Sequence, residues 1–288
     1  MVKALITGGA GFIGSHLAEY LLAIGQEVMV IDDLSTGRIE NLKSIHNHPN
    51  LTIVTDDIRN TSALEPLVRE CDVIYHLAAV LGVQKILKEP IHTIEVNIGG
   101  TEAILKMAHR YTKKVLVAST SEVYGKGTKF PFSEDDDTLV GATSKMRWAY
   151  AATKAVDEFL ALAYHHETDL PVVVFRPFNT VGARQTGQYG MVLPRFVKWA
   201  LAGEPLQVYG DGAQTRCFGN VRDVVDALSA WLAEGPAGLQ RRSDNARRLG
   251  RPEAVWTIAE EVWQHAHKPL IPTNRRMVFM DLPRRALR

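Results

Sequence analysis

A tyrosine and a lysine four residues apart have the clearest potential for chemistry in this chain. Tyr150 and Lys154 lie in the segment RWAYAATK, which predicts the start of a helix that continues to about residue 165. Residues spaced by four lie one turn apart on the same helix face. A neighbouring ammonium stabilises a phenolate, as would the positive ring of a nicotinamide cofactor beside it, and both would lower the pKa of the phenol from about 10 toward neutrality. Tyr150 would then act as a base that removes a proton from a hydroxyl group.

Hydroxyl and carboxyl groups gather in a second segment, STSEVYG, at residues 119–125. It follows an apolar run at residues 114–118, which predicts a buried strand. Because doubly wound sheets place their chemistry at the carboxyl ends of strands, Thr120, Ser121 and Glu122 are expected near a reaction centre. The Tyr-x-x-x-Lys spacing is common by itself, and its meaning depends on this strand end and on a nearby cofactor site.

A glycine-rich loop at the N-terminus predicts that cofactor site. An apolar run at residues 2–6 indicates a buried parallel strand, and an amphipathic helix follows the loop. Between them, Gly8 permits a tight turn, Gly11 leaves room for a diphosphate, and Gly14 lets the helix pack closely on the strand. The helix N-terminus directs unpaired N–H groups at the anion. This strand–loop–helix context predicts dinucleotide contacts from Gly8, Gly11, Phe12, Ile13 and Gly14.

A carboxylate at the end of the second predicted strand, residues 27–31, selects the type of dinucleotide. Asp32 falls eighteen residues after Gly14, where a carboxylate accepts hydrogen bonds from ribose hydroxyls and repels a 2′-phosphate. This favours NAD over NADP, and we prefer Asp32 to Asp33 for the role. Aspartate is also a common turn residue at strand ends, and Arg38 is a nearby cation that could instead hold a 2′-phosphate.

Three further segments are expected on the cofactor side. A third strand at residues 51–54 leads to Asp57 and Ile58, which we place at the edge of the adenine ring. A fourth strand at residues 72–76 ends in small residues that allow the backbone to lie against the pyrophosphate and the nicotinamide ribose. A long helix at about residues 91–111 carries the last candidate. The predicted contacts from these segments are Asp57, Ile58, Leu77, Ala78, Ala79 and Asn97.

Composition sets the broad class of the protein. With 288 residues, 46% hydrophobic and 23% charged, the chain suits one large or two closely joined globular domains. Only two cysteines, no leader pattern and no long apolar stretch lead us to expect a cytoplasmic protein without a membrane partner. The last fifty residues are rich in arginine, but they carry no nucleic-acid-binding motif. We therefore expect neither a nucleic-acid partner nor a metal site.

Taken together, these segments resemble the extended short-chain dehydrogenase/reductases, specifically the NAD-dependent nucleotide-sugar epimerase/dehydratase family. The similarity runs from residue 1 to about residue 226 and rests on the motifs TGGAGFIGSHL, DDIR, HLAA, STSEVYG, YAATK, RPFNTVG and YGDGAQTR. It implies an α/β fold: a doubly wound parallel Rossmann sheet over residues 1–178 and a smaller, interleaved α/β nucleotide-sugar domain over residues 179–288. It also implies a homodimer that packs through the helices at about 91–111 and 146–165. The last fifty residues match the family poorly.

The resemblance assigns a role to each candidate residue. Tyr150 corresponds to the catalytic base, Lys154 to its partner on the nicotinamide ribose, and Thr120 to the hydroxyl that shares the C4 oxygen of the sugar. Glu122 could influence a substrate carboxylate or relay a proton, or it could only orient Thr120. Arg216 resembles an arginine that holds the diphosphate, although a surface arginine after a turn has the same sequence context. The implied substrate contacts are Ser121, Arg147, Asn179, Arg184 and Arg216.

The reaction implied by the resemblance begins with oxidation of the sugar at C4. A 4,6-dehydratase has an acid where Ser121 stands, so dehydration is disfavoured, and the Thr-Ser-Glu triplet resembles UDP-glucuronate decarboxylases. A C4 ketone makes the C6 carboxylate of a glucuronate a β-keto acid, which loses CO2 readily. Decarboxylation and C4 epimerisation of a UDP-hexose both remain open. The alternatives are a UDP-glucose/galactose 4-epimerase and an NAD-binding regulatory protein without turnover; intact Thr120, Tyr150 and Lys154 favour an enzyme.

Overall fold

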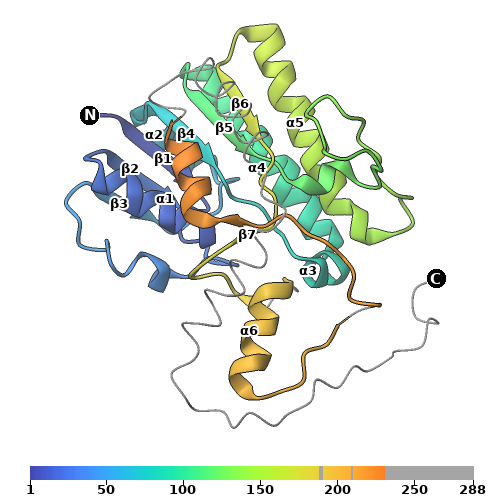
Figure 1. The fold of residues 1–288 in the computed structure, drawn as a ribbon. Coiled ribbons are helices and arrows are strands. Elements are labelled where there is room, and N and C mark those ends of the chain that lie inside the picture. Colours follow the sequence, from blue (N-terminus) through green and yellow to red (C-terminus); the bar gives the residue numbers. More distant parts are fainter. Residues whose placement is uncertain (188–190, 209, 231–288) are drawn as a thin grey trace.

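A parallel six-stranded sheet forms the centre of the molecule (Figure 1). The structure is a computed structural model, and it describes residues 1–187, 191–208 and 210–230. The strand order β3-β2-β1-β4-β5-β6 reverses direction between β1 and β4, which is where ligands bind in open sheets of this type. The strands are β1 (Lys3–Thr7), β2 (Glu27–Ile31), β3 (Leu51–Val54), β4 (Val73–His76), β5 (Lys114–Ala118) and β6 (Val172–Phe175).

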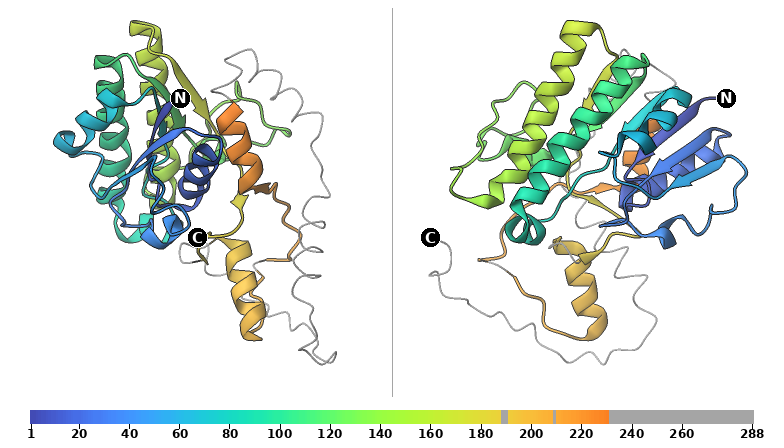
Figure 2. Two further views of the ribbon diagram at one scale, coloured as in Figure 1. Left: turned by 90° about the vertical axis from the view of Figure 1, so that its left-hand side faces the viewer. Right: turned by 180° about the vertical axis from the view of Figure 1, so that it is seen from behind.

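Helices cover both faces of this sheet, as the predicted doubly wound fold requires (Figure 2). One face packs against α1 and the other against α2, α4 and α5, because successive strand side chains point to opposite faces. In β1, for example, Ala4 and Ile6 join the first core and Leu5 joins the second. The helices are α1 (Phe12–Ala23), α2 (Thr61–Glu70), α3 (Val83–Lys88), α4 (Pro90–Arg110) and α5 (Ala149–Thr168).

Short 3₁₀ segments mark three connections. Between β2 and β3 the chain forms only η1 (Ile39–Leu42), so the regular alternation of strands and helices expected from the sequence is wrong at this one connection. The segment η2 (Ser121–Tyr124) follows β5, and η3 (Met146–Trp148) precedes α5. Both lie beside the residues that the sequence singles out for chemistry.

After β6 the chain leaves the sheet and then returns to it. Strands β7 (Thr180–Val181) and β8 (Gly219–Asn220) pair in parallel, and α6 (Val192–Ala202) lies beyond them, away from the sheet (Figure 1). Residues 221–230 are helical, and Val221, Val225 and Leu228 pack into the same core as α1. The expected boundary at residue 178 stays a prediction. The arginine-rich end of the expected second domain lies outside the described residues.

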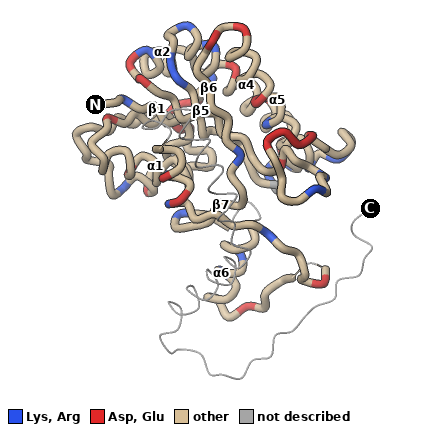
Figure 3. The backbone as a smooth tube through the Cα atoms, turned by 45° about the horizontal axis from the view of Figure 1, so that its top comes forward, with Lys and Arg blue, Asp and Glu red and all other residues tan. Residues whose placement is uncertain are grey.

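Charged side chains of both signs are spread over the outer helices and loops, with an acidic run at residues 134–137 (Figure 3). Within the part of the chain that the structure describes, four charged residues are nevertheless buried: Asp32, Lys154, Asp157 and Glu158. Burying a charge is unfavourable unless it is paired or hydrogen-bonded, so each of these four side chains is expected to have a specific partner within the fold. Among the described residues, no helix has both the length and the apolar character needed to cross a bilayer.

Candidate active site

The glycine-rich loop packs so closely on its surroundings that side chains are excluded. Gly8 has a positive φ of 70°, and a Cβ atom there would lie 2.9 Å from the Cα atom of Ala78. A Cβ atom on Gly14 would lie 2.3 Å from the carbonyl oxygen of Gly8. The helix α1 starts with Gly11 as its N-cap and has no acidic residue in its first turn. Its first N–H groups therefore face the loop, which is the arrangement that holds a diphosphate.

Asp32 is held against this loop by backbone donors. Its Oδ2 accepts a hydrogen bond from the Ala10 N–H at 2.9 Å, and its Oδ1 accepts one from the Leu34 N–H at 2.9 Å. Burial raises the pKa of the Asp32 carboxyl, and the two backbone donors act in the opposite direction. Asp33 is exposed, so the geometry agrees with the preference for Asp32. The close loop, the helix N-terminus and this carboxylate together fit the diphosphate and ribose of a dinucleotide.

The other expected cofactor residues already have partners within the chain. Both carboxylate oxygens of Asp57 accept hydrogen bonds from Arg59, whose cation lowers the pKa of Asp57. Ile58 is buried against α4. The segment at residues 77–79 follows β4 beside Gly8, and the N–H of Ala78 donates to Thr7 Oγ1 at 3.2 Å. Contacts of these residues with a cofactor stay predictions.

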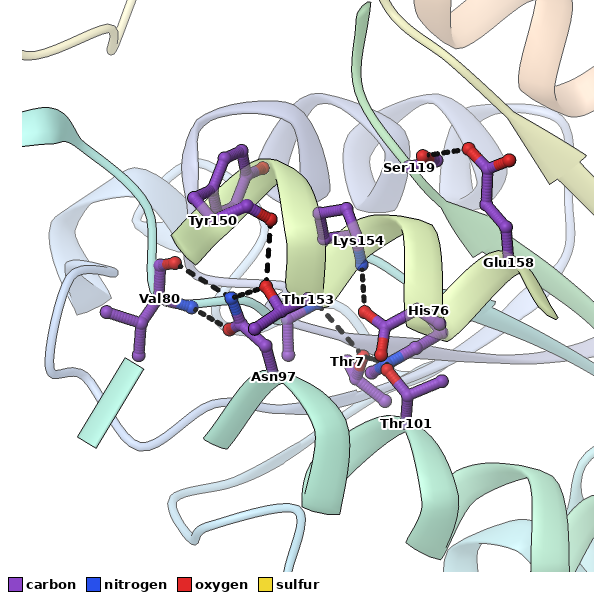
Figure 4. Close-up of polar contacts among 12 residues, drawn as sticks. Thr7, His76, Val80, Asn97, Thr101, Ser119, Tyr150, Thr153, Lys154 and Glu158 are labelled. Carbon is purple, nitrogen blue, oxygen red and sulfur yellow. Dashed lines mark hydrogen bonds and ion pairs between the residues drawn. The ribbon is translucent and has the colours of Figure 1, made fainter. Parts of the chain in front are cut away.

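Asn97 acts as a bridge in the described structure (Figure 4). Its Oδ1 accepts from the Val80 N–H at 2.8 Å, and its Nδ2 donates to the Val80 carbonyl and to Thr153 Oγ1, each at 3.2 Å. The amide thus ties the loop after β4 to α5, one residue before Lys154. A contact between Asn97 and the cofactor stays a prediction, whereas its bridging position is observed.

A buried ionic network fixes the strand end that carries Thr120. Ser119 Oγ donates to Glu158, and the Arg176 guanidinium binds both oxygens of Glu158, at 2.9 and 2.6 Å. The network joins the ends of β5 and β6 to α5. Thr120 then caps η2, where its Oγ1 accepts from the Glu122 N–H at 3.2 Å. Sequence reasoning missed Glu158 and Arg176, although Glu158 follows Lys154 by one helical turn.

Tyr150 lies beside the groups expected near it, but the direction of its pKa shift differs from the expectation. Burial raises its pKa most, and the carboxylates of Glu122 and Asp157 raise it further. Only a hydrogen bond with Thr120 lowers it. The expectation that Lys154 brings the phenol toward neutrality is therefore wrong for the chain's own groups. The main reason is burial of the phenol. The Lys154 ammonium is itself paired with Asp157, to whose Oδ2 it donates at 2.7 Å.

Glu122 and Arg147 are the next charged groups of the site, and Arg147 influences Glu122 electrostatically rather than through an ion pair. Atoms packed around the Glu122 carboxyl raise its pKa, and Arg147 lowers it. Arg147 itself is exposed, with its guanidinium carbon 4.4 Å from the centre of the Trp148 ring. The N–H of Ser121 donates to the Pro177 carbonyl at 3.3 Å, which links η2 to the chain after β6. Glu122 can thus hold a proton at a higher pH than an ordinary carboxyl group.

The remaining expected substrate residues come from the chain after β6. Asn179 is exposed and its Nδ2 donates to the Cys217 carbonyl at 2.8 Å. Arg216 is exposed and donates to the Thr215 carbonyl at 2.7 Å. Arg184 forms an ion pair with Glu19 on α1, at 2.6 Å. The structure therefore brings Thr120, Glu122 and Tyr150 together, and Lys154 is linked to Tyr150 through Asp157. It directs Arg184 toward α1. Substrate contacts of these residues stay predictions.

Comparison with known proteins places this geometry in a family. The model of the NAD dependent epimerase/dehydratase family matches residues 4–244. UDP-N-acetyl-alpha-D-glucosaminuronate decarboxylase from Bacillus cytotoxicus is 48% identical over 81% of this chain and 71% of its own length. UDP-glucuronic acid decarboxylase 4 from Arabidopsis thaliana is 40% identical over 82% of this chain, which spans about half, 52%, of that relative.

Solved structures give the same result. UDP-glucuronic acid 4-epimerase from Bacillus cereus, in complex with UDP-glucuronic acid and NAD, superposes with a TM-score of 0.73. It is 33% identical, and the match covers 81% of this chain and 74% of that one. The predicted Rossmann fold and the family resemblance are both confirmed. The chain belongs to the NAD dependent epimerase/dehydratase family.

Proposed function

We propose that the protein oxidises C4 of a UDP-linked hexuronate to a ketone and then removes the C6 carboxylate as CO2. The observation that carries this proposal is the grouping of Thr120, Tyr150 and Lys154 with Glu122 at the carboxyl end of β5, beside the dinucleotide loop. Support also comes from relatives, because both decarboxylases compared above are named for nucleotide-linked uronates. UDP-glucuronate and UDP-N-acetylglucosaminuronate are therefore the two substrates to test first.

NAD, the cofactor of the family, supplies the oxidant when bound: it accepts the two electrons that leave C4 as the hydroxyl becomes a ketone. The chain's own residues provide the binding groups. The N-terminus of α1 would hold the diphosphate, and Asp32 would accept hydrogen bonds from the ribose hydroxyls. Lys154 uses one ammonium N–H on Asp157, so two N–H groups are left for the hydroxyls of the second ribose.

The catalytic groups then have separate tasks. Tyr150 removes the proton from the C4 hydroxyl, and Thr120 hydrogen-bonds the same oxygen. Once C4 is a ketone, the C5–C6 bond breaks, CO2 leaves, and the bonding electrons form an enolate over C5, C4 and the C4 oxygen. The raised pKa of Glu122 suits it to return a proton to C5. The hydride taken from C4 would then be returned to C4, so that the ketone becomes a hydroxyl again and the product is a UDP-pentose. A uronate has no C6 hydroxyl to lose, and Ser121 stands where a 4,6-dehydratase has an acid, so dehydration does not compete.

A second candidate function is C4 epimerisation of UDP-glucuronate. The solved UDP-glucuronic acid 4-epimerase shares one third of its aligned residues with this chain and the same fold, which favours this candidate. Both reactions use the same first step at C4. In epimerisation the ketone is reduced on its other face and the carboxylate is kept. In decarboxylation CO2 leaves while C4 is still a ketone.

The product identifies the reaction. Incubation of the purified protein and NAD+ with each UDP-uronate, followed by NMR of the nucleotide sugar, is expected to show a UDP-pentose and equimolar CO2. A C4-epimer that retains its carboxylate would establish the second candidate instead. Lack of any new sugar from both uronates and from a panel of UDP-, dTDP- and GDP-hexoses would contradict the enzyme proposal and favour a regulatory protein.

We also propose that the protein is a homodimer. Helices α4 and α5 lie side by side on the outside of the molecule (Figure 2). Their outer faces expose apolar residues at helical spacing: Ile91, Ile94, Val156, Phe159 and Leu162. Phe159 and Ile91 are each 72% exposed. Exposed apolar residues on two neighbouring helices favour a protein interface, and a second copy of the same helices can cover them symmetrically.

A charge placed in this face should separate the subunits. Phe159→Glu is expected to convert a dimeric protein to a monomer in sedimentation velocity, because the dimer would bury an uncompensated carboxylate. Leu201→Glu on α6, where the side chain is 79% exposed, is the matched control and should leave the dimer intact. A monomeric wild type, or a Phe159→Glu dimer of unchanged mass, would contradict this interface.

A cytoplasmic location is likewise a proposal. It is supported by the two cysteines, Cys71 and Cys217, neither of which forms a disulfide. Fractionation of the source cells tests it.

A further inference from the structure

A third residue of α5 lies on the stripe that carries Tyr150 and Lys154. Asp157 follows Lys154 by three residues and Tyr150 by seven, a spacing that keeps all three on one helix face. Its side chain is fully buried, and Lys154 is only 2% exposed. The Lys154 Nζ donates to Asp157 Oδ2 at 2.7 Å. This ion pair is therefore shielded from solvent and lies directly beside the candidate base.

We propose that Asp157 is a positioning residue that holds the Lys154 ammonium in place and, by offsetting its charge, sets the pH range in which Tyr150 works. The proposal rests on the proposed function, because it assigns Asp157 a part in the ionisation of the same base. It goes beyond that function in treating a carboxylate, rather than Lys154 alone, as the group that controls Tyr150.

The position of Lys154 supports the first half of this proposal. A lysine side chain has a flexible stem of four carbons, and its ammonium is a compact charge without a preferred direction. In this structure the Lys154 side chain points from α5 toward the region of His76 and Thr101 (Figure 4). Asp157 fixes the ammonium there through a single hydrogen bond. The other two N–H groups stay available to a ligand while the charge remains compensated.

The charges around Tyr150 support the second half. From the end of β5 and η2, Tyr150 faces Thr120 and Glu122, and Arg147 acts on Glu122. From its own helix the Asp157 carboxylate acts on Tyr150, and Lys154 is paired with that carboxylate. The Asp157 carboxylate raises the pKa of Tyr150, because a negative charge opposes formation of a phenolate. Asp157 thus works against ionisation of the base, and its hydrogen bond with Lys154 offsets the ammonium charge that would otherwise favour a phenolate.

The groups on β4 and α4 leave this balance unchanged. His76 is buried between Thr7 Oγ1, at 2.8 Å, and Thr101 Oγ1, at 3.0 Å (Figure 4). Burial, together with the Lys154 charge, lowers the pKa of His76 to about 3, so it is neutral at physiological pH. On α4, Asn97 and Thr101 are uncharged. The carboxylates that bear on Tyr150 are therefore Asp157 and Glu122, and Lys154 is paired with the first of them.

The substitution Asp157→Asn separates charge from shape. The amide has the same size and can still accept a hydrogen bond from Lys154, but it has no negative charge. With that charge removed, the phenolate of Tyr150 is easier to form. The ionisation of Tyr150 should then move to lower pH, and so should the acid limb of a pH profile that requires the ionised base.

Ultraviolet titration of tyrosinate in the NAD+-loaded protein measures this shift without turnover. The signal of Tyr150 in the wild type is obtained by subtracting the titration of Tyr150→Phe. Its signal in Asp157→Asn is obtained by subtracting the titration of the double variant Asp157→Asn, Tyr150→Phe. We expect its midpoint to fall by about one pH unit in Asp157→Asn. Circular dichroism and NAD+ titration calorimetry establish that each variant is folded and loaded.

Glu167→Gln is the matched control, because it makes the same charge change at an exposed position of α5, far from Tyr150 along the helix. Its Tyr150 midpoint should stay within the error of wild type. An unchanged or higher midpoint in Asp157→Asn, or an equal shift in Glu167→Gln, would overturn the proposal. Because the titration needs no sugar, a wild type that fails on every nucleotide sugar while Asp157→Asn shows the shift would overturn the proposed function and support the role of Asp157.

Discussion

Tyr150→Phe is expected to lower turnover by about 10²- to 10⁴-fold while NAD+ binding and the fold persist. The change removes one hydroxyl oxygen and keeps the ring, so the packing of α5 against β5 stays intact. Without the phenol, the C4 hydroxyl has no base positioned to take its proton. Thr120 is close to the same oxygen in the proposed complex, but a neutral hydroxyl cannot replace a phenolate as the proton acceptor. Steady-state rates with the best UDP-uronate and calorimetry with NAD+ provide the two measurements.

The chain offers a matched control on the same helix. Tyr164 also lies on α5, fourteen residues further along and thus about 21 Å away. Its ring contacts His109 on α4, and Tyr164→Phe should keep turnover near that of wild type. Equal activity of wild type and Tyr150→Phe would remove Tyr150 from the role of base. Loss of NAD+ binding in Tyr150→Phe would show that the phenol supports the cofactor rather than the proton transfer.

Lys154→Met is expected to reduce the free energy of unfolding by about 3–5 kcal/mol and to weaken NAD+ binding. Methionine fills the volume of the lysine stem but leaves the Asp157 carboxylate buried without its cation. An uncompensated buried charge is the costly product of breaking such a pair. Denaturant unfolding at neutral pH measures the loss. Burial already raises the pKa of Asp157, and without Lys154 this carboxyl protonates more readily, so the deficit should shrink as the pH falls.

A double variant tests the explanation. Lys154→Met combined with Asp157→Leu replaces both charges by apolar groups, which in other buried pairs restores stability. We expect unfolding near the wild-type value and no recovery of turnover, because no ammonium remains to bind the ribose. Lys154→Met with the stability of wild type would contradict the buried pair. A double variant as unstable as Lys154→Met would contradict it as well.

Local patterns predicted the fold and the cofactor loop well. The apolar runs that became β1 to β5 are short and bounded by polar residues, and strands buried on both faces need only that signal. The sequence could indicate the positions of three loop residues, because their roles depend on close backbone contacts within one strand–loop–helix unit: Gly8, Gly14 and Asp32. The connection between β2 and β3 was predicted less well, because η1 is held by contacts that no periodic pattern reveals.

The electrostatics of the site could not be read from the sequence. An aspartate three residues after a lysine on a helix ordinarily forms a solvated surface pair, and only packing of α5 against α4 makes Asp157 buried. The same packing reverses the expected direction of the Tyr150 pKa shift. Arg184 lies two residues after the motif RPFNTVG, yet its partner Glu19 lies more than a hundred residues earlier in the chain. Pairings of this range depend on topology rather than on spacing.

Deuterium at C4 of the UDP-uronate provides the most direct measurement of the central claim, which is that the C4 hydroxyl is oxidised with Tyr150 as the base. Tyr150 exchanges its proton with water, but the proton it takes comes from oxygen and not from carbon. During turnover of the labelled substrate, the C4 deuterium should therefore never enter the solvent, and NMR of the water should show no enrichment above background. Release of deuterium to water in step with product formation would mean that a base removes hydrogen directly from C4, and it would contradict the proposed function.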